Sequence, residues 1–235
     1  MNHVIVTGHQ RASMADADRL AGYGVATVHE AMGRMGLAGP HLRPIQQGTA
    51  VAGTAVTVLS WPGDNLMIHA AVEQCQEGDL LVVTTTSESS DGMFGDLFAT
   101  ALKHRGVRGL VTTAGVRDTA DLRAMGFPVW AGAVSAQGTV KATGGSVNVP
   151  VTLGRAAVRA GDIVVADDDG VVVVPQERVA ATLKASEARV RKEEATRQAF
   201  LGGELGLDRY GLRSELERLG VRYVSADVPA EDHAG

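Results

Sequence analysis

Apolar positions in the first two thirds of the chain follow two rhythms, one typical of buried strands and the other of amphipathic helices. Strand-like runs occupy residues 80–83, 109–113 and 129–131, and helix-like stretches lie between them at 96–105 and 118–125. A strand–helix–strand path brings successive strands into one sheet in the same direction, so this alternation predicts an α/β fold with a largely parallel sheet. Three further elements are expected before these runs: a helix over 15–36, a strand over 51–59 and a helix over 65–74.

The pattern changes near residue 138, where short strand-like runs are separated by glycines. The dipeptide Asp169-Gly170 lies between the valine-rich runs 164–166 and 171–174, which is a strong signal for a β-hairpin. The expected strands of this half are 138–142, 146–152, 162–166 and 171–174.

A long, charge-rich helix is expected from residue 175 to residue 202. Its apolar positions are sparse, and a stripe this thin cannot bury the helix in a core of its own. The helix is therefore either solvated or an arm that lies on another subunit. With a last helix at about 206–219, this divides the chain into an α/β core (1–174), a helical arm (175–224) and a tail expected to be disordered (225–235).

Composition and charge narrow the classes of protein to consider. Of the 235 residues, 45% are apolar and 21% are charged, the balance of a globular protein with a substantial core. The net charge is −5 and no basic block occurs, so we expect no nucleic-acid surface. No run of about 18 apolar residues and no secretory leader is present, so we expect a cytoplasmic protein without membrane spans. The single Cys75 excludes an internal disulfide and a cysteine-cluster metal site.

Two aspartates and an arginine stand where strand-like runs meet helix-like ones. Asp96 follows a Ser/Thr/Gly-rich loop, and Arg117-Asp118 closes the run that begins at residue 109. Because the intervening path returns to the same sheet edge, both carboxylates can reach one pocket. Two carboxylates and a guanidinium there would suit a hard divalent cation and an anionic oxo acid.

Each aspartate also has a purely structural interpretation. Asp96 and Asp118 both stand at the start of an expected helix, where aspartate commonly caps backbone N–H groups. Arg117 favours the functional interpretation, because a cation at the end of a buried strand is costly unless it is paired. The carboxyl ends of strands are also where ligands bind in open α/β sheets. Spacing alone leaves both interpretations open.

Three other residues admit two interpretations as well. Gly92 and Gly95 either make a loop flexible or let backbone N–H groups from Gly95 to Leu97 approach a ligand carboxylate at a helix N-terminus. Glu193 lies in the charged helix, where pairing with Arg197 on a solvated face would explain it. No nucleotide-binding or hydrolase glycine motif and no histidine ligand spacing occurs.

Several of these segments together resemble the regulator-of-ribonuclease-activity-A-like superfamily. They are the Asp96…Arg117-Asp118 spacing and the segments 95–97, 166–171 and 42–45. Within that superfamily, the C-terminal segment 203–213 is similar to that of the 4-hydroxy-4-methyl-2-oxoglutarate/4-carboxy-4-hydroxy-2-oxoadipate aldolases. The resemblance covers roughly residues 15–224. It departs at Ala160, where the family usually has proline, and at Thr113-Ala114-Gly115, where an acidic residue commonly precedes the glycine.

The resemblance implies a layered α/β/α swivelling-domain fold with a C-terminal helical arm. It also implies a homo-oligomer, either a trimer or a hexamer built from two trimers. In the arm, Glu193 would match an acidic residue that reaches the site of a neighbouring subunit, and the adjacent Glu194 leaves a choice between the two.

The resemblance further implies roles for the motif residues. Asp118 would hold Mg²⁺ or Mn²⁺ through a water-rich shell, with Asp96 on a metal-bound water. Arg117 would bind the pyruvyl end of the substrate. The backbone at Gly95, Asp96 and Leu97 would hold the oxo-acid carboxylate.

The implied activity is that of a divalent-metal-dependent pyruvate aldolase in aromatic-compound catabolism. It would cleave 4-hydroxy-4-methyl-2-oxoglutarate or 4-carboxy-4-hydroxy-2-oxoadipate to pyruvate plus pyruvate or oxaloacetate, with oxaloacetate decarboxylation as a side activity. No lysine lies in the motif, which argues against a Schiff-base aldolase. No histidine is placed as a general base, so a water near Asp96 is expected in that role. The alternative is a non-catalytic, ribonuclease-regulating binding protein of the same fold.

Overall fold

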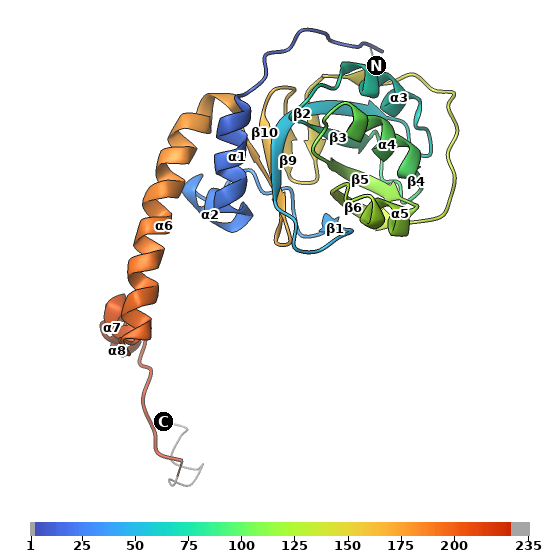
Figure 1. The fold of residues 1–235 in the computed structure, drawn as a ribbon. Helices are drawn as coiled ribbons and strands as arrows, with labels where there is room; N and C mark the ends of the chain where they lie inside the picture. Colours follow the sequence, from blue (N-terminus) through green and yellow to red (C-terminus); the bar gives the residue numbers. More distant parts are fainter. Residues whose placement is uncertain (1–2, 227–235) are drawn as a thin grey trace. The chain divides into compact units, whose positions relative to one another are not determined.

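The computed structural model describes residues 3–226, and the chain divides into two compact units, Met1–Arg189 and Val190–Gly235. The first unit is built on a nine-stranded sheet in the order β1-β6-β5-β3-β2-β10-β11, with β4 beside β5 and β7 beside β2 (Figure 1). Its strands are β1 Arg43–Pro44, β2 Val51–Ser60, β3 Asp79–Thr85, β4 Gly92–Phe94, β5 Leu110–Val116, β6 Val129–Val134, β7 Ser146–Val147, β10 Ile163–Asp167 and β11 Gly170–Val174.

The sheet is mixed, with a parallel centre and antiparallel flanks. Strands β2, β3, β5 and β6 run parallel, and the short β4 runs parallel to β5. Strands β10 and β11 form the antiparallel hairpin that Asp169-Gly170 predicts, and β10 adds to β2 antiparallel. The largely parallel sheet expected from the sequence is therefore confirmed for the centre alone.

Two expected strands of the second half, 146–152 and 138–142, differ from the structure. The run 146–152 forms two short pieces, β7 and β8 (Val151–Leu153), and β8 pairs with β9 (Ala156–Val158) in a separate two-stranded sheet. Residues 138–142 form no named strand; only Val140 makes an isolated bridge, with Asp64.

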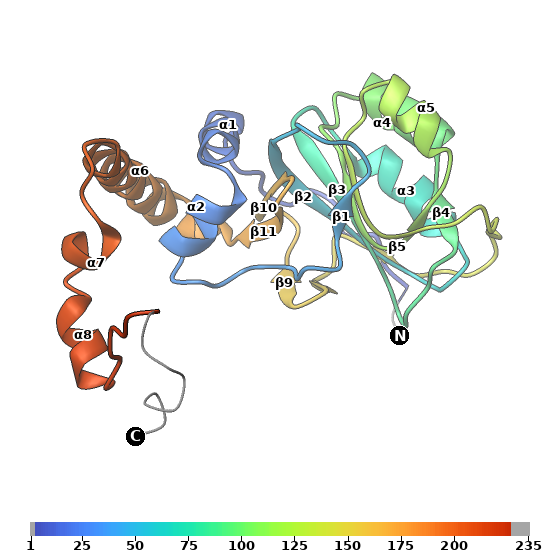
Figure 2. The same cartoon turned by 90° about the horizontal axis from the view of Figure 1, so that it is seen from below.

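Helices cover the outer face of the sheet in two groups. Helices α3 (Leu66–Gln74), α4 (Asp96–His104) and α5 (Thr119–Ala124) lie together beside the parallel strands, and α1 (Met14–Tyr23) and α2 (Val25–Ala31) lie beside β10 and β11 (Figures 1 and 2). The helix expected over 15–36 is thus two helices. Gly24 separates them with a φ of 78°, a left-handed conformation that glycine adopts without a steric cost.

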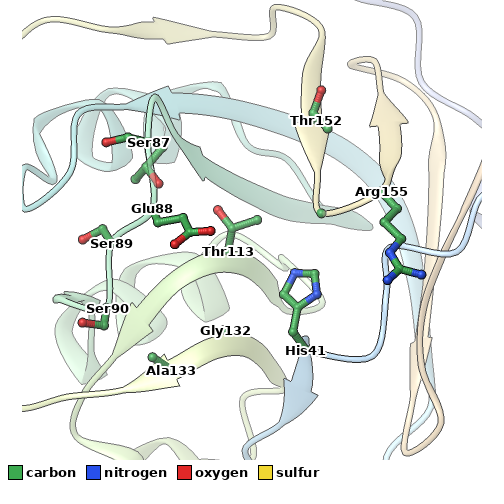
Figure 3. A pocket seen from close by; sticks show the side chains of 12 residues that line it. His41, Ser87, Glu88, Ser89, Ser90, Thr113, Gly132, Ala133, Thr152 and Arg155 are labelled. Atoms are coloured by element: carbon green, nitrogen blue, oxygen red, sulfur yellow. The ribbon is translucent and has the colours of Figure 1, made fainter.

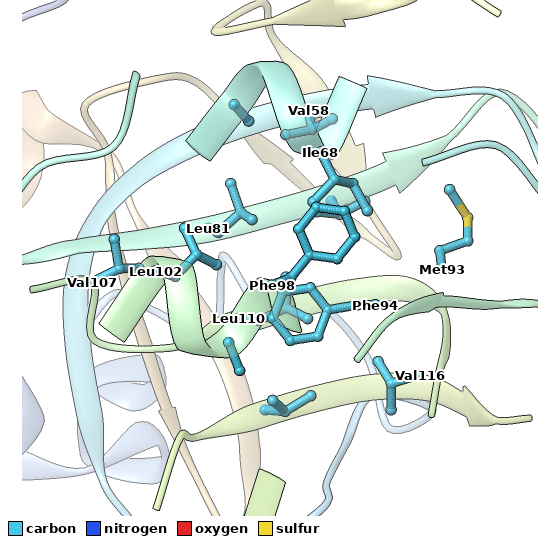
Figure 4. Close-up of a cluster of buried hydrophobic side chains, with 14 of the residues drawn as sticks. Val58, Ile68, Leu81, Met93, Phe94, Phe98, Leu102, Val107, Leu110 and Val116 are labelled. Atoms are coloured by element: carbon cyan, nitrogen blue, oxygen red, sulfur yellow. The ribbon is translucent and has the colours of Figure 1, made fainter. Parts of the chain in front are cut away.

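Successive side chains of each strand point to opposite faces of the sheet, and apolar residues are buried on both faces. On β3, Leu81 and Val83 pack with α3 and α4, whereas Leu80 and Val82 face the inner layer, which contains the fully buried Trp130. Figure 4 shows the helix-side cluster, in which Phe94 and Phe98 stack with ring centroids 5.6 Å apart. A strand that is apolar on both faces is expected where helices or other layers cover both sides. The layered α/β class predicted from the sequence is confirmed, although the inner face of the sheet is covered by β8 and β9 and not by a second layer of helices.

A long helix leads from the first unit into the second. Helix α6 (Val179–Leu201) buries Val179, Thr182, Leu183 and Ser186 in its first two turns, and its later side chains are not buried. A short 3₁₀ helix, Gln176–Arg178, precedes it. The boundary between the two compact units falls within α6, at Arg189/Val190.

The second unit contains two short helices. The last helix expected from the sequence, about 206–219, is formed as α7 (Gly206–Arg209) and α8 (Arg213–Arg218), separated near Gly211, whose φ is 65°. Tyr210 packs edge-on against Phe200 at 6.2 Å. The disordered tail expected over 225–235 lies outside the described residues from 227 onward.

Between residues 3 and 226, no helix combines the length and apolar character that crossing a bilayer requires.

The buried thiol of Cys75 gives a direct test of the core around α3. Burial raises the pKa of this thiol to about 12, and the nearby Asp79 carboxylate acts in the same direction. Because the thiolate is the reactive form, we expect Cys75 to resist Ellman's reagent at pH 8 in the native protein and to react fully in guanidinium chloride. Rapid labelling of the native protein would contradict this packing.

Candidate functional site

The pairing of β4 with β5 brings the two halves of the aspartate–arginine–aspartate pattern together. Phe94 lies beside Val116 in the parallel ladder, and the Arg117 N–H donates to the Phe94 carbonyl at 2.9 Å. Both strands end here, so the next residues of each strand, Gly95-Asp96 and Arg117-Asp118, leave the sheet at the same place. The sequence predicted this convergence from the crossover, but it treated β4 as part of a loop.

The Asp118 carboxylate is held between the two segments. Its Oδ2 atom lies 3.3 Å from Arg117 Nε and accepts a hydrogen bond from the Asp96 N–H at 3.4 Å. Asp118 adopts the left-handed conformation (φ 53°, ψ 38°), which is uncommon for a residue other than glycine and is typical of functional sites. Neither Asp118 before α5 nor Asp96 in the first turn of α4 makes a side-chain capping bond. Neither aspartate therefore caps the helix that it begins; the Asp118 carboxylate instead accepts the first N–H of α4.

Gly95 is required by close packing and not by backbone conformation. A Cβ atom at this position would lie 2.2 Å from Asp118 Oδ2 and 3.2 Å from Arg117 Cγ. Its φ of −153° is ordinary extended backbone. Gly92 is crowded in the same way, because a Cβ there would lie 2.4 Å from the Ser135 carbonyl oxygen. These contacts favour the close-approach interpretation of the two glycines over a flexible loop.

A cavity of about 300 Å³ opens beside this junction. The residues named from the sequence, Gly95, Asp96, Leu97, Arg117 and Asp118, all line it. The other lining residues come from α3, β4, α4 and the segment after β6: Asn65, His69, Val72, Gly92, Met93, Phe98, Ala101 and Lys141.

Sequence reasoning missed Asn65, His69 and Lys141. Asn65 and His69 are four residues apart at the start of α3 and so share one face of that helix, a signal that could have been noticed. Lys141 lies in a segment expected to be a strand, and nothing in its local sequence points to the pocket. The cavity therefore contains a histidine and a lysine that lie outside the sequence motif, and His69 corrects the expectation that no histidine is placed near the reacting groups.

Burial and one neighbouring cation lower the pKa of the histidine in this cavity. Partial burial lowers the pKa of His69, and the positive charge of Lys141 lowers this pKa further. The imidazole packs on Phe98 with ring centroids 4.4 Å apart. Both effects favour the neutral form of the His69 imidazole, which is the form that can accept a proton.

The donor set of the pocket fits a hard cation. Among residues 3–226, no group of three or more His, Cys, Asp or Glu side chains could hold a metal ion. A structural or catalytic zinc site requires three or four such ligands. Mg²⁺ instead keeps several waters and needs one or two carboxylates together with substrate oxygens, which Asp118 and Asp96 can supply.

Glu193 and Glu194 are not brought to this cavity by the first unit. Both lie on α6 in the second unit, whereas every residue that lines the cavity belongs to the first. Glu194 pairs with Arg197 and accepts a hydrogen bond from Gln198 at 2.7 Å.

A larger cavity, of about 680 Å³, contains none of the site residues that the sequence analysis proposed for catalysis, substrate or metal. Figure 3 shows its hydroxyl-rich lining, with Glu88 and Thr113 among the polar side chains and His41 near the β8–β9 turn. It has one carboxylate and lacks an adjacent arginine–aspartate pair, so the cavity beside Asp118 is the candidate site. A third cavity, of about 280 Å³, is lined by Arg117 and Asp118 together with Val134.

Comparison with known proteins places this architecture in a family. The model of the RraA-like family, Aldolase/RraA, matches residues 25–173. This chain belongs to the Aldolase/RraA family. A family member from Halalkalibacterium halodurans, whose name assigns it provisionally as a 4-hydroxy-4-methyl-2-oxoglutarate aldolase, is 27% identical over 169 residues, 72% of this chain and 80% of that protein.

Solved structures give the same family relationship. Streptomyces coelicolor RraAS2, described as an unusual member of the RNase ES inhibitor RraA protein family, has a TM-score of 0.72 and 26% identity, covering 81% of this chain and 99% of the other. An uncharacterized protein from Pseudomonas syringae has a TM-score of 0.74 at 22% identity, over 85% and 94% of the two chains, and shows the shared fold. The Aldolase/RraA family thus includes both a lyase-named relative and ribonuclease inhibitors.

Gly95→Ala tests the packing of the site. The added methyl group would displace the Asp118 carboxylate and the Arg117 side chain, and a displacement of about 1 Å can cost about 10²-fold in rate. We expect a loss of this size in pyruvate release and a weakened Mn²⁺ affinity by calorimetry. Gly22→Ala, on α1 with open space around it, is the matched control and should leave both unchanged. Equal Mn²⁺ affinity in the two variants would refute the packing argument.

Proposed function

We propose that this protein is a divalent-metal-dependent pyruvate aldolase of aromatic-compound catabolism. It would cleave 4-hydroxy-4-methyl-2-oxoglutarate or 4-carboxy-4-hydroxy-2-oxoadipate to pyruvate plus pyruvate or oxaloacetate, and would decarboxylate oxaloacetate as a side reaction. The supporting observation is that Arg117 contacts Asp118 at the mouth of a cavity that also contains Asp96. The lyase-named relative supports the reaction class.

The reaction needs a stabilised negative charge on the 2-keto oxygen. When the bond between C3 and C4 breaks, its electron pair passes into the pyruvate half as an enolate, and the 4-hydroxyl proton goes to a base. Asp118 and Asp96 would hold Mg²⁺ or Mn²⁺, which supplies Lewis-acid polarisation of the keto acid when bound. Arg117 adds a fixed positive charge at the developing oxyanion, a contribution of about 2.7–4 kcal/mol for a preorganised donor.

Backbone N–H groups at the start of α4 would position the keto acid. The first-turn N–H groups of a helix have no intrahelical partner and favour anions. The nine-residue helix α4 begins at Asp96, so the Leu97 N–H points out of the helix end that lines the cavity. This group would hold the substrate's 1-carboxylate.

A base must accept the 4-hydroxyl proton. We propose a water beside Asp96 for this role, and His69 in the same cavity, whose neutral form is favoured by its lowered pKa, is the second candidate. In the retro-aldol direction the same group would return the proton to C3 of the enolate, through solvent, to complete pyruvate.

The protein would work as a homo-oligomer, a trimer or a hexamer, in which Glu193 or Glu194 of one copy approaches the site of the next. The exposed apolar side chains of the second unit, Leu201, Leu205 and Tyr210 among them, support a partner surface there. Light scattering after gel filtration would measure the number of copies.

Because Lys141 lies in the cavity, a Schiff-base aldolase must be distinguished by experiment from a metal-dependent one. A Schiff-base aldolase would use Lys141, would work in chelator and would be trapped by borohydride with pyruvate. We expect EDTA to abolish pyruvate release, Mg²⁺ to restore it, and mass spectrometry after borohydride to show the unmodified mass. Activity that persists in EDTA would reject the metal-dependent mechanism.

Arg117→Ala should lower kcat/KM for pyruvate release by about 10²–10³-fold, because the oxyanion then loses its fixed cation. Arg19→Ala, on the exposed face of α1, is the matched control and should keep full activity. A lactate-dehydrogenase-coupled assay with both oxo diacids and oxaloacetate measures these rates. If the wild-type protein releases no pyruvate but binds and inhibits a ribonuclease, the non-catalytic alternative, which the RraAS2 relationship favours, would replace the aldolase.

A further inference from the structure

Asp64 is a buried carboxylate that joins two segments far apart in the sequence. Its side chain is 2% exposed. Oδ1 accepts the N–H of Leu66 at 2.9 Å, in the first turn of α3, and Oδ2 accepts the N–H groups of Ala142 at 2.9 Å and Thr143 at 2.6 Å. One carboxylate therefore fixes the start of α3 and the segment around residue 142 in a single network.

Backbone bonds on both sides complete this connection. The Val140 N–H donates to the Gly63 carbonyl at 2.9 Å, and the Asn65 N–H donates to the Val140 carbonyl at 3.0 Å. Lys141 is thus the residue between Val140 and Ala142, both of which are bonded to the 63–65 turn. A segment without secondary structure of its own is held in place at either side of this lysine.

The carboxylate is well suited to hold its position at neutral pH. Burial alone would raise the pKa of Asp64, but the N–H groups of Leu66, Ala142 and Thr143 outweigh burial, and the pKa lies below its ordinary value. Three N–H donors to one charged acceptor form strong hydrogen bonds. The anchor is therefore present throughout the range in which the protein would act.

Lys141 carries an unmatched positive charge into the candidate site. Its side chain lines the same cavity as Arg117 and Asp118, and it makes no ion pair with any residue between 3 and 226. Arg117 already has Asp118 as a partner. A substrate with one carboxylate and a keto group satisfies the Arg117 end of the cavity and leaves the ammonium group of Lys141 without an anion.

We propose that Lys141 binds the second carboxylate of a dicarboxylic 2-oxo acid, and that Asp64 is the positioning residue that places Lys141 for this contact. Asp64 does not touch the substrate; it acts through the backbone on each side of the lysine. The inference rests on the proposed function for the identity of the reaction, but the selectivity it assigns is a property of binding.

A pair of unreactive ligands isolates the second carboxylate. 2-Oxoglutarate and 2-oxovalerate have the same five-carbon chain and the same keto-acid end, and the second ends in a methyl group instead of a carboxylate. Calorimetry on the full chain with saturating Mg²⁺ gives the ratio of their dissociation constants. We expect the wild-type protein to prefer 2-oxoglutarate by about tenfold or more, as a charged hydrogen bond would give.

Two substitutions then test the two residues separately. Lys141→Met should bring the ratio close to one while 2-oxovalerate binds as before. In Asp64→Asn, the Ala142 and Thr143 N–H groups face either the amide N–H₂ or a neutral amide oxygen, and the charged acceptor is lost. We therefore expect the preference for 2-oxoglutarate to fall several-fold, while the affinity for 2-oxovalerate stays unchanged. Asp121→Asn, an exposed carboxylate on α5, is the matched control and should keep the wild-type ratio.

Asp64→Ser covers the case in which Asp64→Asn does not fold. Serine can still cap the Leu66 N–H, but it is too short to reach Ala142 and Thr143, so the helix is kept and only the Lys141 segment is released. An unchanged ratio in Lys141→Met, or in a folded Asp64 variant, would overturn the proposal. A wild-type protein that shows the tenfold preference but cleaves no oxo diacid would support this inference and reject the aldolase function.

Discussion

The short parallel pairing between β4 and β5 is the interaction on which the site depends. Without it, Gly95-Asp96 and Arg117-Asp118 would belong to two separate loops. With it, the Arg117 N–H is bonded to the Phe94 carbonyl, and Asp118 can accept the Asp96 N–H. The pairing is tight enough to exclude side chains: a Cβ on Gly115, which lies beside Gly92, would meet the Ser90 carbonyl oxygen at 2.1 Å. Glycines are therefore used where two backbones must touch.

The same junction is supported from below by the core. Phe94, which ends β4, stacks between Phe98 of α4 and Phe127 before β6, at 5.6 and 6.0 Å. In a chain with only 4% aromatic residues, this cluster sits under the strand ends that carry the functional side chains. A ring that is packed on both faces is restricted to few rotamers. The segments that follow β4 and β5 therefore leave the sheet in one arrangement. The polar groups of the candidate site are thus held on a rigid apolar cluster, which fixes their geometry.

Local pattern was enough to predict the crossover and the convergence of Asp96 with Arg117-Asp118, because a right-handed strand–helix–strand path leaves little freedom. It was not enough where a partner distant in sequence decides the structure. Residues 138–142 alternate like a strand, yet the Asp64 carboxylate takes the N–H groups of Ala142 and Thr143 and no ladder forms there. Lys141 could not be assigned to the pocket for the same reason. The helix over 15–36 was predicted too long because Gly24, an ordinary break in structure, looks in sequence like a tolerated glycine.

The central claim is that this junction binds a hard cation and a keto acid together. Electron paramagnetic resonance of Mn²⁺ titrated into the protein measures this directly, since free and bound Mn²⁺ give different signals. The account predicts one site per chain, tightened by pyruvate, and lost in Asp118→Asn while the protein stays folded. Binding of Mn²⁺ that is the same in Asp118→Asn, or that pyruvate does not change, would contradict it.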